Sequence, residues 1–515
     1  MSKVTQPRVI VIGAGIGGLT AGALLARRGY SVLMLDQAIV PGGCASTFKR
    51  RGFTFDVGAT QVAGLEPGGI HHRIFSELEI ELPEATPCDP ACAVFLPNET
   101  QPINVWRDPQ KWQQERQKQF PGSESFWGLM STLFQASWRF QSRDPVLPPR
   151  NLWDLWQLTQ AVRPDTLITL PFTFTTVAQA LRGYQLGDRK RLKTFLDLQL
   201  KLYSQVDTEE TALLYAATAL GVSQEPQGLF HLLGSMQVLS DRLVQALERD
   251  GGKLLMQHTV EAIETENNKA VGVSIRNQKT GEVWREAADI VVANVTVQNL
   301  VKMLPTNSQN SHDPLMRQNY KRRVDRLPPA SGAFVIYLGV DEAAIPAECP
   351  PHLQFLYDYH KPIGENNSLF VSVSHPGDGR APEGKATIIA SSFTDTHQWW
   401  NCDDYEGLKQ QYTRQAIARL SSYFNLTPDT IIYQEAATPR TFARYTARDL
   451  GTVGGLGQRI STFGPFGFAN RTPVEQLWLV GDCTHPGEGT AGVSYSALTV
   501  VRQIEASSAK KLALN

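Results

Sequence analysis

The sequence predicts an α/β fold in which a Rossmann-like nucleotide-binding domain is interrupted by an inserted α+β substrate domain built on an antiparallel sheet. Two observations predict this arrangement. A buried strand, a glycine-rich turn, a helix and a second strand follow one another within residues 9–36. Residues 306–435 instead carry runs that alternate with a two-residue period, which is typical of half-buried antiparallel strands. At 515 residues the chain exceeds one core of ordinary size, so two domains are expected.

The glycine-rich turn indicates a dinucleotide site. Gly13 allows a tight turn after the strand, and Gly15 has no Cβ to block the approach of a pyrophosphate. Gly18 lets the helix pack close to the strand, while the helix N-terminus offers free N–H groups and a positive dipole end. Asp36 ends the second strand about twenty residues beyond the turn, where a carboxylate binds an adenosine ribose. The glycine motif in this setting predicts a bound dinucleotide.

A third element near the C-terminus distinguishes FAD from NAD. The strand Leu477–Val480 ends in Gly481 and Asp482, and a helix is expected to follow from Gly489 onward. The carboxylate can bind a ribityl or ribose hydroxyl, and free N–H groups at the helix start can point at the electron-rich edge of an isoalloxazine. A protein that binds NAD does not need this distant element. The sequence therefore predicts FAD as the cofactor.

Three motifs together resemble the bacterial-type carotenoid desaturases, within the wider group of amine-oxidase-like flavoproteins. The motifs are Gly42-Gly43 after the second strand, Gly-Phe-Thr-Phe-Asp-Val-Gly over residues 52–58, and the run from Gly481 to Gly492. A middle segment, residues 232–253, is also similar to that family. Residues 42–47 together with residues 485–490 look most like the carotenoid 3,4-desaturases, which act on monocyclic or acyclic carotenoids.

The resemblance implies a reaction. It is that of an FAD-dependent desaturase that introduces a C=C bond at C-3',4' of a carotenoid and passes the electrons to oxygen or a quinone. Three alternatives remain open: a carotene cis–trans isomerase that uses reduced FAD, a phytoene desaturase, and a carotenoid carrier with a structural flavin. The intact pyrophosphate turn and the segment from Gly481 to Gly492 argue against the carrier.

The turn and the resemblance together predict the cofactor site. The residues expected to bind FAD are Gly13, Gly15, Gly17, Gly18, Asp36, Gly42, Gly43, Thr60, Val260, Gly481, Asp482, Gly489 and Thr490. In flavoproteins of this plan the backbone at Val260 pairs with the adenine edge. Many members of the family place a glutamate at Asp36 and an arginine at Cys44. The shorter acid changes nothing essential, but Cys44 lacks a cation that could contact the pyrophosphate.

His485 and Glu488 are the candidate catalytic residues. Both lie in the segment expected beside the isoalloxazine, where an acid or base could reach the reacting carbons. The alternative is that His485 packs on its neighbours and Glu488 caps the following helix. No metal site is expected, because the adjacent histidines His71 and His72 would rarely share one ligand face.

The predicted helices and strands indicate which residues belong to each of the two domains. Residues 1–95, 226–305 and 436–515 are expected to form the FAD-binding domain, and residues 96–225 and 306–435 the substrate domain. The first insertion is rich in aromatic residues and helix formers, and the second carries the alternating strands. The substrate pocket is expected between the antiparallel sheet and the flavin, since ligand sites favour domain interfaces.

One segment predicts contact with a membrane surface. Residues 153–174 contain tryptophan, leucine and phenylalanine side chains, and Arg189, Lys190, Arg191 and Lys193 follow. Aromatic rings can enter the headgroup region while cations meet anionic lipid. The alternative is that the rings are core and the charges a solvated helix face. No stretch reaches the length of a membrane span and no secretory signal is found, which predicts a cytoplasmic, peripherally membrane-associated protein.

Composition and motifs exclude other classes. The formal net charge of −1 offers no basic excess to neutralise nucleic-acid phosphates. The six cysteines are scattered, and Cys88 and Cys92 are better read as reduced thiols than as a redox or metal pair. Hydrolase and NTPase motifs are absent from the sequence.

Overall fold

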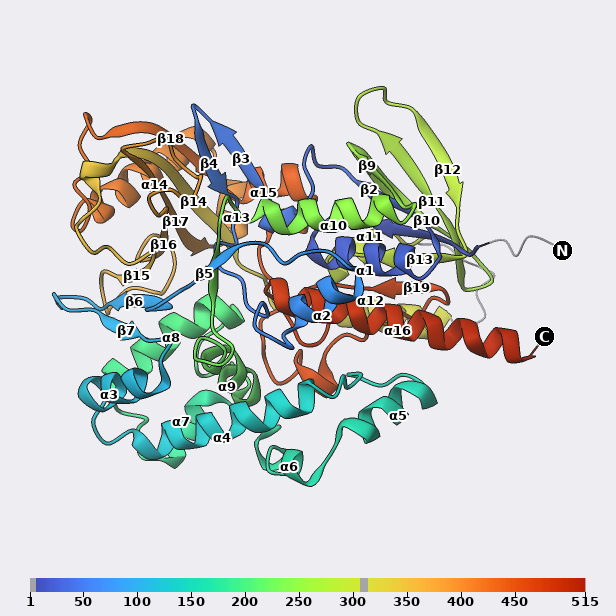
Figure 1. Ribbon diagram of the computed structural model, residues 1–515, viewed down its shortest axis with the longest axis horizontal. Coiled ribbons are helices and arrows are strands. Elements are labelled where there is room, and N and C mark those ends of the chain that lie inside the picture. Colours follow the sequence, from blue (N-terminus) through green and yellow to red (C-terminus); the bar gives the residue numbers. More distant parts are fainter. Residues whose placement is uncertain (1–5, 306–313, 515) are drawn as a thin grey trace.

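The computed structural model describes residues 6–305 and 314–514, and a five-stranded parallel sheet lies in its right-hand half in the view of Figure 1. Its strands, in spatial order, are β19 (Leu477–Leu479), β13 (Ile290–Ala293), β1 (Arg8–Ile12), β2 (Ser31–Asp36) and β9 (Lys253–Met256). Every pair in this sheet is parallel. Strands far apart in the sequence therefore end at one common edge, and that edge is where ligands bind in open α/β sheets.

The two faces of the parallel sheet are covered differently. Side chains of β1 alternate between the two cores, with Val9 and Val11 on the helical side and Ile10 and Ile12 on the other. The helices that contribute to the first core are α1 (Ile16–Arg27), α2 (Ile70–Glu77), α10 (Gln237–Arg249) and α16 (Thr490–Leu514). The elements on the second side are the antiparallel strands β10 (His258–Glu266), β11 (Lys269–Asn277) and β12 (Val283–Ala287), with α11 (Val297–Met303) and α12 (Pro314–Asp325). The predicted Rossmann-like layer arrangement is confirmed.

A second, seven-stranded sheet lies beside the first. Its strands, in spatial order, are β18 (Ile431–Ala437), β14 (Gly332–Asp341), β17 (Lys385–Thr394), β16 (Ser368–Val373), β15 (His352–Leu356), β6 (Cys92–Phe95) and β7 (Ile103–Val105). All its pairs are antiparallel except β15 with β6, which is parallel. The predicted antiparallel sheet is therefore present, with one parallel pair that the alternation could not reveal.

Strands β14 and β15 of this sheet are buried on both faces and not half-buried as predicted. β14 is buried along both faces, from Gly332 to Val340. One face packs on α13 (Thr396–Asn401) and α14 (Tyr405–Leu420). The other face packs on the hairpin β3 (Thr47–Arg50) and β4 (Phe53–Asp56) and on α15 (Pro439–Thr446). The prediction was wrong because a two-residue period shows which face is more apolar, not whether other elements cover the second face.

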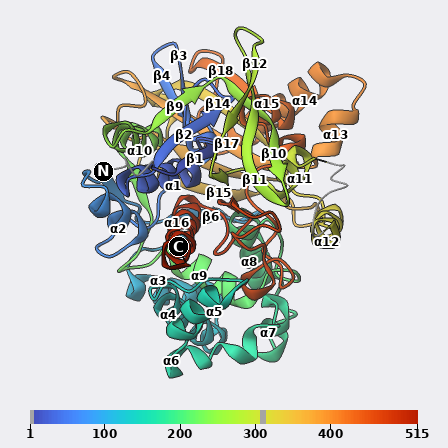
Figure 2. The ribbon, with the colours of Figure 1, turned by 90° about the vertical axis from the view of Figure 1, so that its right-hand side faces the viewer.

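A group of helices closes the remaining side of the molecule, below both sheets in the two views (Figures 1 and 2). These helices are α3 (Pro109–Gln119), α4 (Glu124–Gln141), α5 (Leu152–Ala161), α6 (Pro164–Leu167), α7 (Val177–Gly183), α8 (Lys190–Ser204) and α9 (Leu213–Gly221). Their core contains Trp112, Phe126 and Phe195 and reaches strands β6 and β7. The remaining short elements are β5 (Ala85–Pro87), β8 (Phe230–Leu232), η1 (Gly43–Ala45), η2 (Leu170–Phe172), η3 (Glu342–Ala344), η4 (Asp449–Gly451) and η5 (Gly464–Phe466).

The predicted domain boundaries stay a prediction. Strand β6 belongs to the seven-stranded sheet although it lies before the boundary at residue 95, and β18 crosses the boundary at residue 435. Positions 1–5, 306–313 and 515, where some of the predicted ranges begin or end, lie outside the described residues. Among the residues that the structure describes, no helix is both long and apolar enough to cross a bilayer.

Candidate functional site: one cavity with a nucleotide end and an apolar end

A single cavity of about 1180 Å³ joins all three parts of the fold. It begins at the carboxyl edge of the parallel sheet, where Asp36 ends β2 and Gly13, Asn294 and Asp482 follow β1, β13 and β19. It continues past residues of the seven-stranded sheet and ends among residues of α4, α5 and α9. The predicted location between sheet and nucleotide site agrees with this geometry, and the cavity also extends into the helices.

The nucleotide end is built mainly from backbone. Gly15 is the N-cap of α1 and no side chain caps that helix, so its first N–H groups face the cavity without an internal acceptor. The carboxylate of Asp36 is held by two backbone donors, Ala14 N at 2.6 Å and Ala38 N at 2.7 Å. Burial raises the pKa of Asp36, and both hydrogen bonds oppose that shift. A preoriented carboxylate beside a free helix N-terminus is what a dinucleotide requires.

Asn294 is a residue of this site that sequence reasoning missed. Its Nδ2 donates to Val480 O at 3.1 Å, which joins the ends of β13 and β19. A Cβ on Gly15 would lie 2.8 Å from Asn294 Oδ1, and one on Gly13 would lie 2.6 Å from Asn294 O. The glycines are therefore required by a protein neighbour as well as by a ligand. The available signal was a polar residue directly after a fully apolar strand.

Most of the predicted FAD-binding residues line the cavity. These are Gly13, Gly15, Gly17, Asp36, Gly42, Gly43, Thr60, Val260, Asp482, Gly489 and Thr490. Gly18 and Gly481 do not line the cavity, but pack against residues that do. A Cβ on Gly18 would be 2.0 Å from Gly13 O, and one on Gly481 would be 2.7 Å from Asn294 Nδ2. Both positions need glycine for close packing, and a direct contact of any of these residues with FAD stays a prediction.

Two further features fit a flavin nucleotide. Thr60 lines the cavity, and its hydroxyl oxygen is buried without a hydrogen-bond partner among the described residues. Gly489 has a φ of +88° and open space where a Cβ would stand, just before α16 begins. An orphaned polar atom and an unobstructed helix start are both suited to a large polar ligand.

Arg448 stands at the same wall. It follows α15, and its Nη1 donates to Asp482 Oδ2 at 2.8 Å while its Nε donates to Thr452 O at 2.8 Å. Burial alone lowers the pKa of this guanidinium, but Asp482 and then Cys44 raise it above its ordinary value. The Cys44 thiol in turn has a raised pKa, mainly through burial. The side chains of Cys44, Arg448 and Asp482 thus form one electrostatically coupled group.

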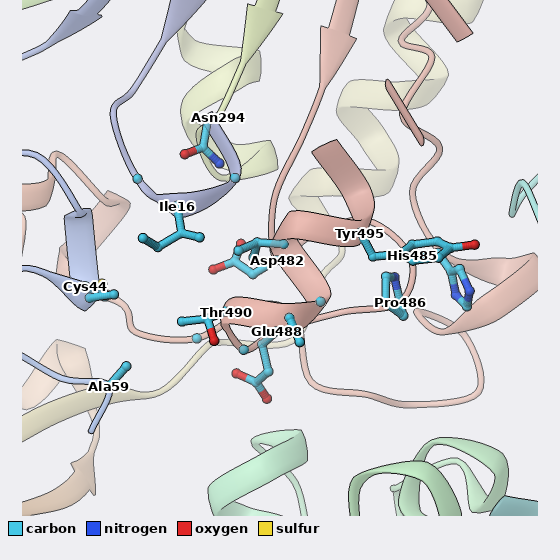
Figure 3. Close-up of a pocket in the computed structure, with 18 of the residues that line it drawn as sticks. Ile16, Cys44, Ala59, Asn294, Asp482, His485, Pro486, Glu488, Thr490 and Tyr495 are labelled. Carbon is cyan, nitrogen blue, oxygen red and sulfur yellow. The ribbon is translucent and has the colours of Figure 1, made fainter. Parts of the chain in front are cut away.

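The two candidate catalytic residues differ in their surroundings (Figure 3). Glu488 points away from α16, and its Oε2 accepts from Gln205 Nε2 at 3.0 Å and from Gly455 N at 3.2 Å. Its Oε1 has no partner among the described residues, and burial raises its pKa to about 8. His485 lies apart, beside Tyr495, and burial lowers its pKa to about 4.

His485 is held by its neighbours. Its Nε2 lies 2.9 Å from Gln141 Oε1, and its ring packs between Phe463 and Tyr495. This is the arrangement expected for a packed neutral imidazole. Glu488 does not hydrogen-bond the start of α16 in the contacts of the described chain, so it does not act as the helix cap that was the alternative reading.

The apolar end of the cavity opens among exposed hydrophobic side chains. Trp138, Phe140, Leu158 and Ala219 line it. Val162, Leu167 and Leu170 line it too, and they are also exposed. Neighbouring exposed side chains are Leu152, Leu155, Trp156, Ile168 and Phe174. We call these eight exposed residues the apolar patch. Exposed apolar side chains gathered in this way mark an interaction surface.

Two of the four basic residues predicted next to this patch form ion pairs within the chain. Arg191 binds Glu99 through two nitrogens and also donates to Gln119 O. Lys193 donates to Asp197 at 3.0 Å. Arg189 and Lys190 are exposed. Arg191 and Lys193, two of the four cations expected to meet anionic lipid, thus pair within the chain with residues that are distant in sequence or one helical turn away, and the contact with lipid stays a prediction.

Comparisons with known proteins agree with the geometry. A family model described as NAD(P)-binding Rossmann-like domain matches residues 11–78. Prolycopene isomerase 2, chloroplastic, from an Oncidium hybrid cultivar is 28% identical over 96% of this chain and 83% of its own length. 4,4'-diapophytoene desaturase (4,4'-diapolycopene-forming) from Methylomonas sp is 24% identical over 95% of this chain and 93% of its own length.

The solved structures show the fold. Cyclohexylamine oxidase from Brevibacterium oxydans IH-35A superposes with a TM-score of 0.60 at 18% identity, covering 97% of this chain and 100% of that one. The amine-oxidase-like flavoprotein fold predicted from the sequence is confirmed, and FAD is the cofactor that this fold and these relatives indicate. The chain is an oxidoreductase related to the carotenoid isomerase- and desaturase-type FAD enzymes.

Proposed function

We propose that this protein is an FAD-dependent carotenoid desaturase that introduces a C=C bond at C-3',4' of its substrate. The observation that carries the proposal is the continuity of the cavity, in which the nucleotide end and the apolar end share one space. Both a flavin and a long apolar molecule can then meet inside the protein. A polyene has no polar handle along its length, so selection by shape in an apolar channel suits it.

Glu488 is the proposed proton acceptor. FAD, when bound, supplies the acceptor for a hydride that leaves one carbon of the substrate. The neighbouring carbon must then lose a proton, and its C–H electron pair becomes the new C=C bond. Glu488 fits this task because it lines the cavity and its buried Oε1 has no hydrogen-bond partner among the described residues. A pKa of about 8 keeps the group near the pH at which a base works best.

A carotene cis–trans isomerase is the second candidate. It is favoured by the relatives, since the prolycopene isomerase match is 28% identical and the desaturase match 24%. The two reactions differ in their electron balance. A desaturase removes two hydrogens from the carotenoid and leaves the flavin reduced, whereas an isomerase returns a product of unchanged composition.

Product mass and flavin redox state separate these candidates. Purified, FAD-loaded protein is incubated without oxygen with monocyclic and acyclic carotenoids in lipid micelles. The proposal expects loss of the oxidised flavin band, a red shift of the carotenoid and a product lighter by two hydrogens. A product of unchanged mass, formed only after the flavin has been reduced, would establish the isomerase instead. An unaltered carotenoid in both states would overturn both and favour a carrier.

Docking of the apolar patch on a membrane surface is part of this proposal. The substrate resides in lipid, and the patch surrounds the part of the cavity lined by Val162, Leu167 and Leu170. Insertion of these side chains would connect the cavity to the bilayer interior without any spanning helix. Oxygen or a quinone is the proposed final electron acceptor, and a quinone would reach the flavin by the same lipid route.

A further inference from the structure

The cations on the cavity wall are few and differ in what they pair with. Among the described residues, the lysine and arginine side chains lining the cavity are Arg73, Lys302 and Arg448. Arg73 binds Asp144, and Lys302 binds Asp449, and neither of those carboxylates lines the cavity. Arg448 is the cation whose partner, Asp482, is itself part of the wall.

Arg448 lies next to the loop that touches the start of α1. Gly42 N donates to Ala14 O at 2.8 Å, and a Cβ on Gly43 would lie 3.3 Å from Gly15 Cα. Cys44 follows directly, and its thiol interacts electrostatically with both Arg448 and Asp482. The guanidinium thus lines the same cavity as the uncapped N-terminus of α1 and interacts with the loop that contacts this terminus.

Some N–H donors of the guanidinium make no hydrogen bond within the described chain. An arginine carries five N–H donors, and it stays charged in proteins. Arg448 uses one each on Thr452 O, Asp482 Oδ2 and Gly454 O, and the contacts within the described chain engage no others. A side chain that is held in place by three hydrogen bonds and retains free donors is preorganised for an anion.

We propose that Arg448 binds the diphosphate of FAD, sharing it with the N-terminus of α1. A helix N-terminus supplies only about half an elementary charge, whereas a diphosphate carries about two. Asp36 and Asp482 place further carboxyl groups on the same wall. A full positive charge beside Cys44 supplies the missing neutralisation and draws the nucleotide toward the glycine turn.

The competing role is that Arg448 only neutralises Asp482. In that case the arginine would act on the ribityl end of the cofactor and not on its phosphates. The two roles are separated by ligands that lack the flavin. The inference rests on FAD binding and not on the carotenoid reaction, so these measurements are independent of the proposed function.

The test compares ADP and adenosine binding to the apoprotein by calorimetry, for the parent and for Arg448→Met. The proposal expects ADP to bind about 10- to 100-fold more weakly to the variant, with adenosine affinity unchanged. FAD affinity, followed by quenching of flavin fluorescence, should fall by a similar factor. Unchanged ADP affinity would overturn the proposal.

Two second-site variants complete the design. Cys44→Arg in the Arg448→Met background restores a cation to the same wall and should recover most of the ADP affinity. Asp482→Asn in that background removes the carboxylate, and recovery of ADP affinity by this change alone would show the competing role and overturn ours. If Arg448→Met loses adenosine binding as well, recovery of both ligands by Cys44→Arg supports the proposal, and failure to recover them overturns it.

Discussion

The two ends of the cavity are built from different kinds of contact. At the nucleotide end, backbone N–H groups, glycines and the half-buried amide side chain of Asn294 define much of the wall, and several of the residues come from strand ends of one parallel sheet. At the apolar end, the wall includes side chains from α4, α5 and α9 and from the segment that follows α5. The first end tolerates little change in shape, whereas the second is defined by apolar volume.

The two ends differ in how strongly ligand binding depends on precise atomic positions. A diphosphate is recognised by donors at fixed positions, so a displaced atom removes a hydrogen bond. A polyene is recognised by the space and apolar surface available to it, so the loss is graded. Substitutions at the two ends should therefore separate cofactor affinity from turnover, and the following predictions are ordered from the largest expected effect to the smallest.

Gly15→Val is expected to abolish FAD binding. A Cβ at this position would lie 2.8 Å from Asn294 Oδ1, and the branched side chain would also fill the approach of the pyrophosphate. The measurement is the flavin content of the purified protein. Gly128→Val is the matched control, because Gly128 lies in α4 with open space around its Cβ position. Full yellow colour in the Gly15 variant would contradict the described site.

Glu488→Gln is expected to lower turnover by about 10²- to 10⁴-fold, the range typical of a lost general base. FAD content should stay the same. In the parent, the rate should rise with pH and level off above a pKa of about 8, because the ionised form is the base. The variant should lose this step. A parent profile that is flat through this range would exclude Glu488 as the acceptor.

The same carboxyl group also predicts how stability depends on pH. Its pKa in the folded protein, about 8, lies above the ordinary 4.5, so the folded state holds a proton that the unfolded state releases. The free energy of unfolding should therefore fall as pH rises from about 4.5 to about 8. Glu488→Gln should remove this contribution, which chemical denaturation at pH 6 and pH 9 measures.

Leu152→Ser, Trp156→Ser and Leu170→Ser together are expected to weaken sedimentation with liposomes by at least about tenfold. These side chains are 79%, 60% and 61% exposed, so their loss should not disturb the core. Val283→Ser is the matched control, since that valine is 48% exposed on β12 and far from the patch in the fold. Equal binding by the triple variant and the control would refute docking through the patch.

Arg189→Gln with Lys190→Gln is expected to have the smallest effect, up to about 2 kcal/mol on binding to anionic liposomes at low salt. High salt should remove the difference, because exposed charges are screened. Neutralising Arg191 and Lys193 instead would break intramolecular ion pairs and test stability rather than docking. A salt-independent difference would point to a structural effect.

The sequence predicts residues of the site whose positions are set by local structure, and it does not predict those whose positions depend on long-range contacts. Gly13, Gly15 and Asp36 could be assigned because their spacing is fixed by a local strand–turn–helix unit. Asn294 and Arg448 could not, since they join the wall only when β13 and the segment after α15 meet strands that are distant in sequence. The partners of Arg191 and the burial of β14 on both faces also depend on contacts between residues distant in sequence, so the sequence alone did not predict them.

The most direct test of the account is whether the two ends of the cavity can be uncoupled by Ala219→Trp. Ala219 lines the apolar end on α9, where a tryptophan would fill the space assigned to the polyene. The account predicts unchanged FAD affinity together with loss of flavin reduction by the carotenoid, measured by stopped-flow absorbance without oxygen. Normal flavin reduction, or loss of FAD binding in a variant that is otherwise folded, would contradict the division of one cavity into a nucleotide end and a substrate end.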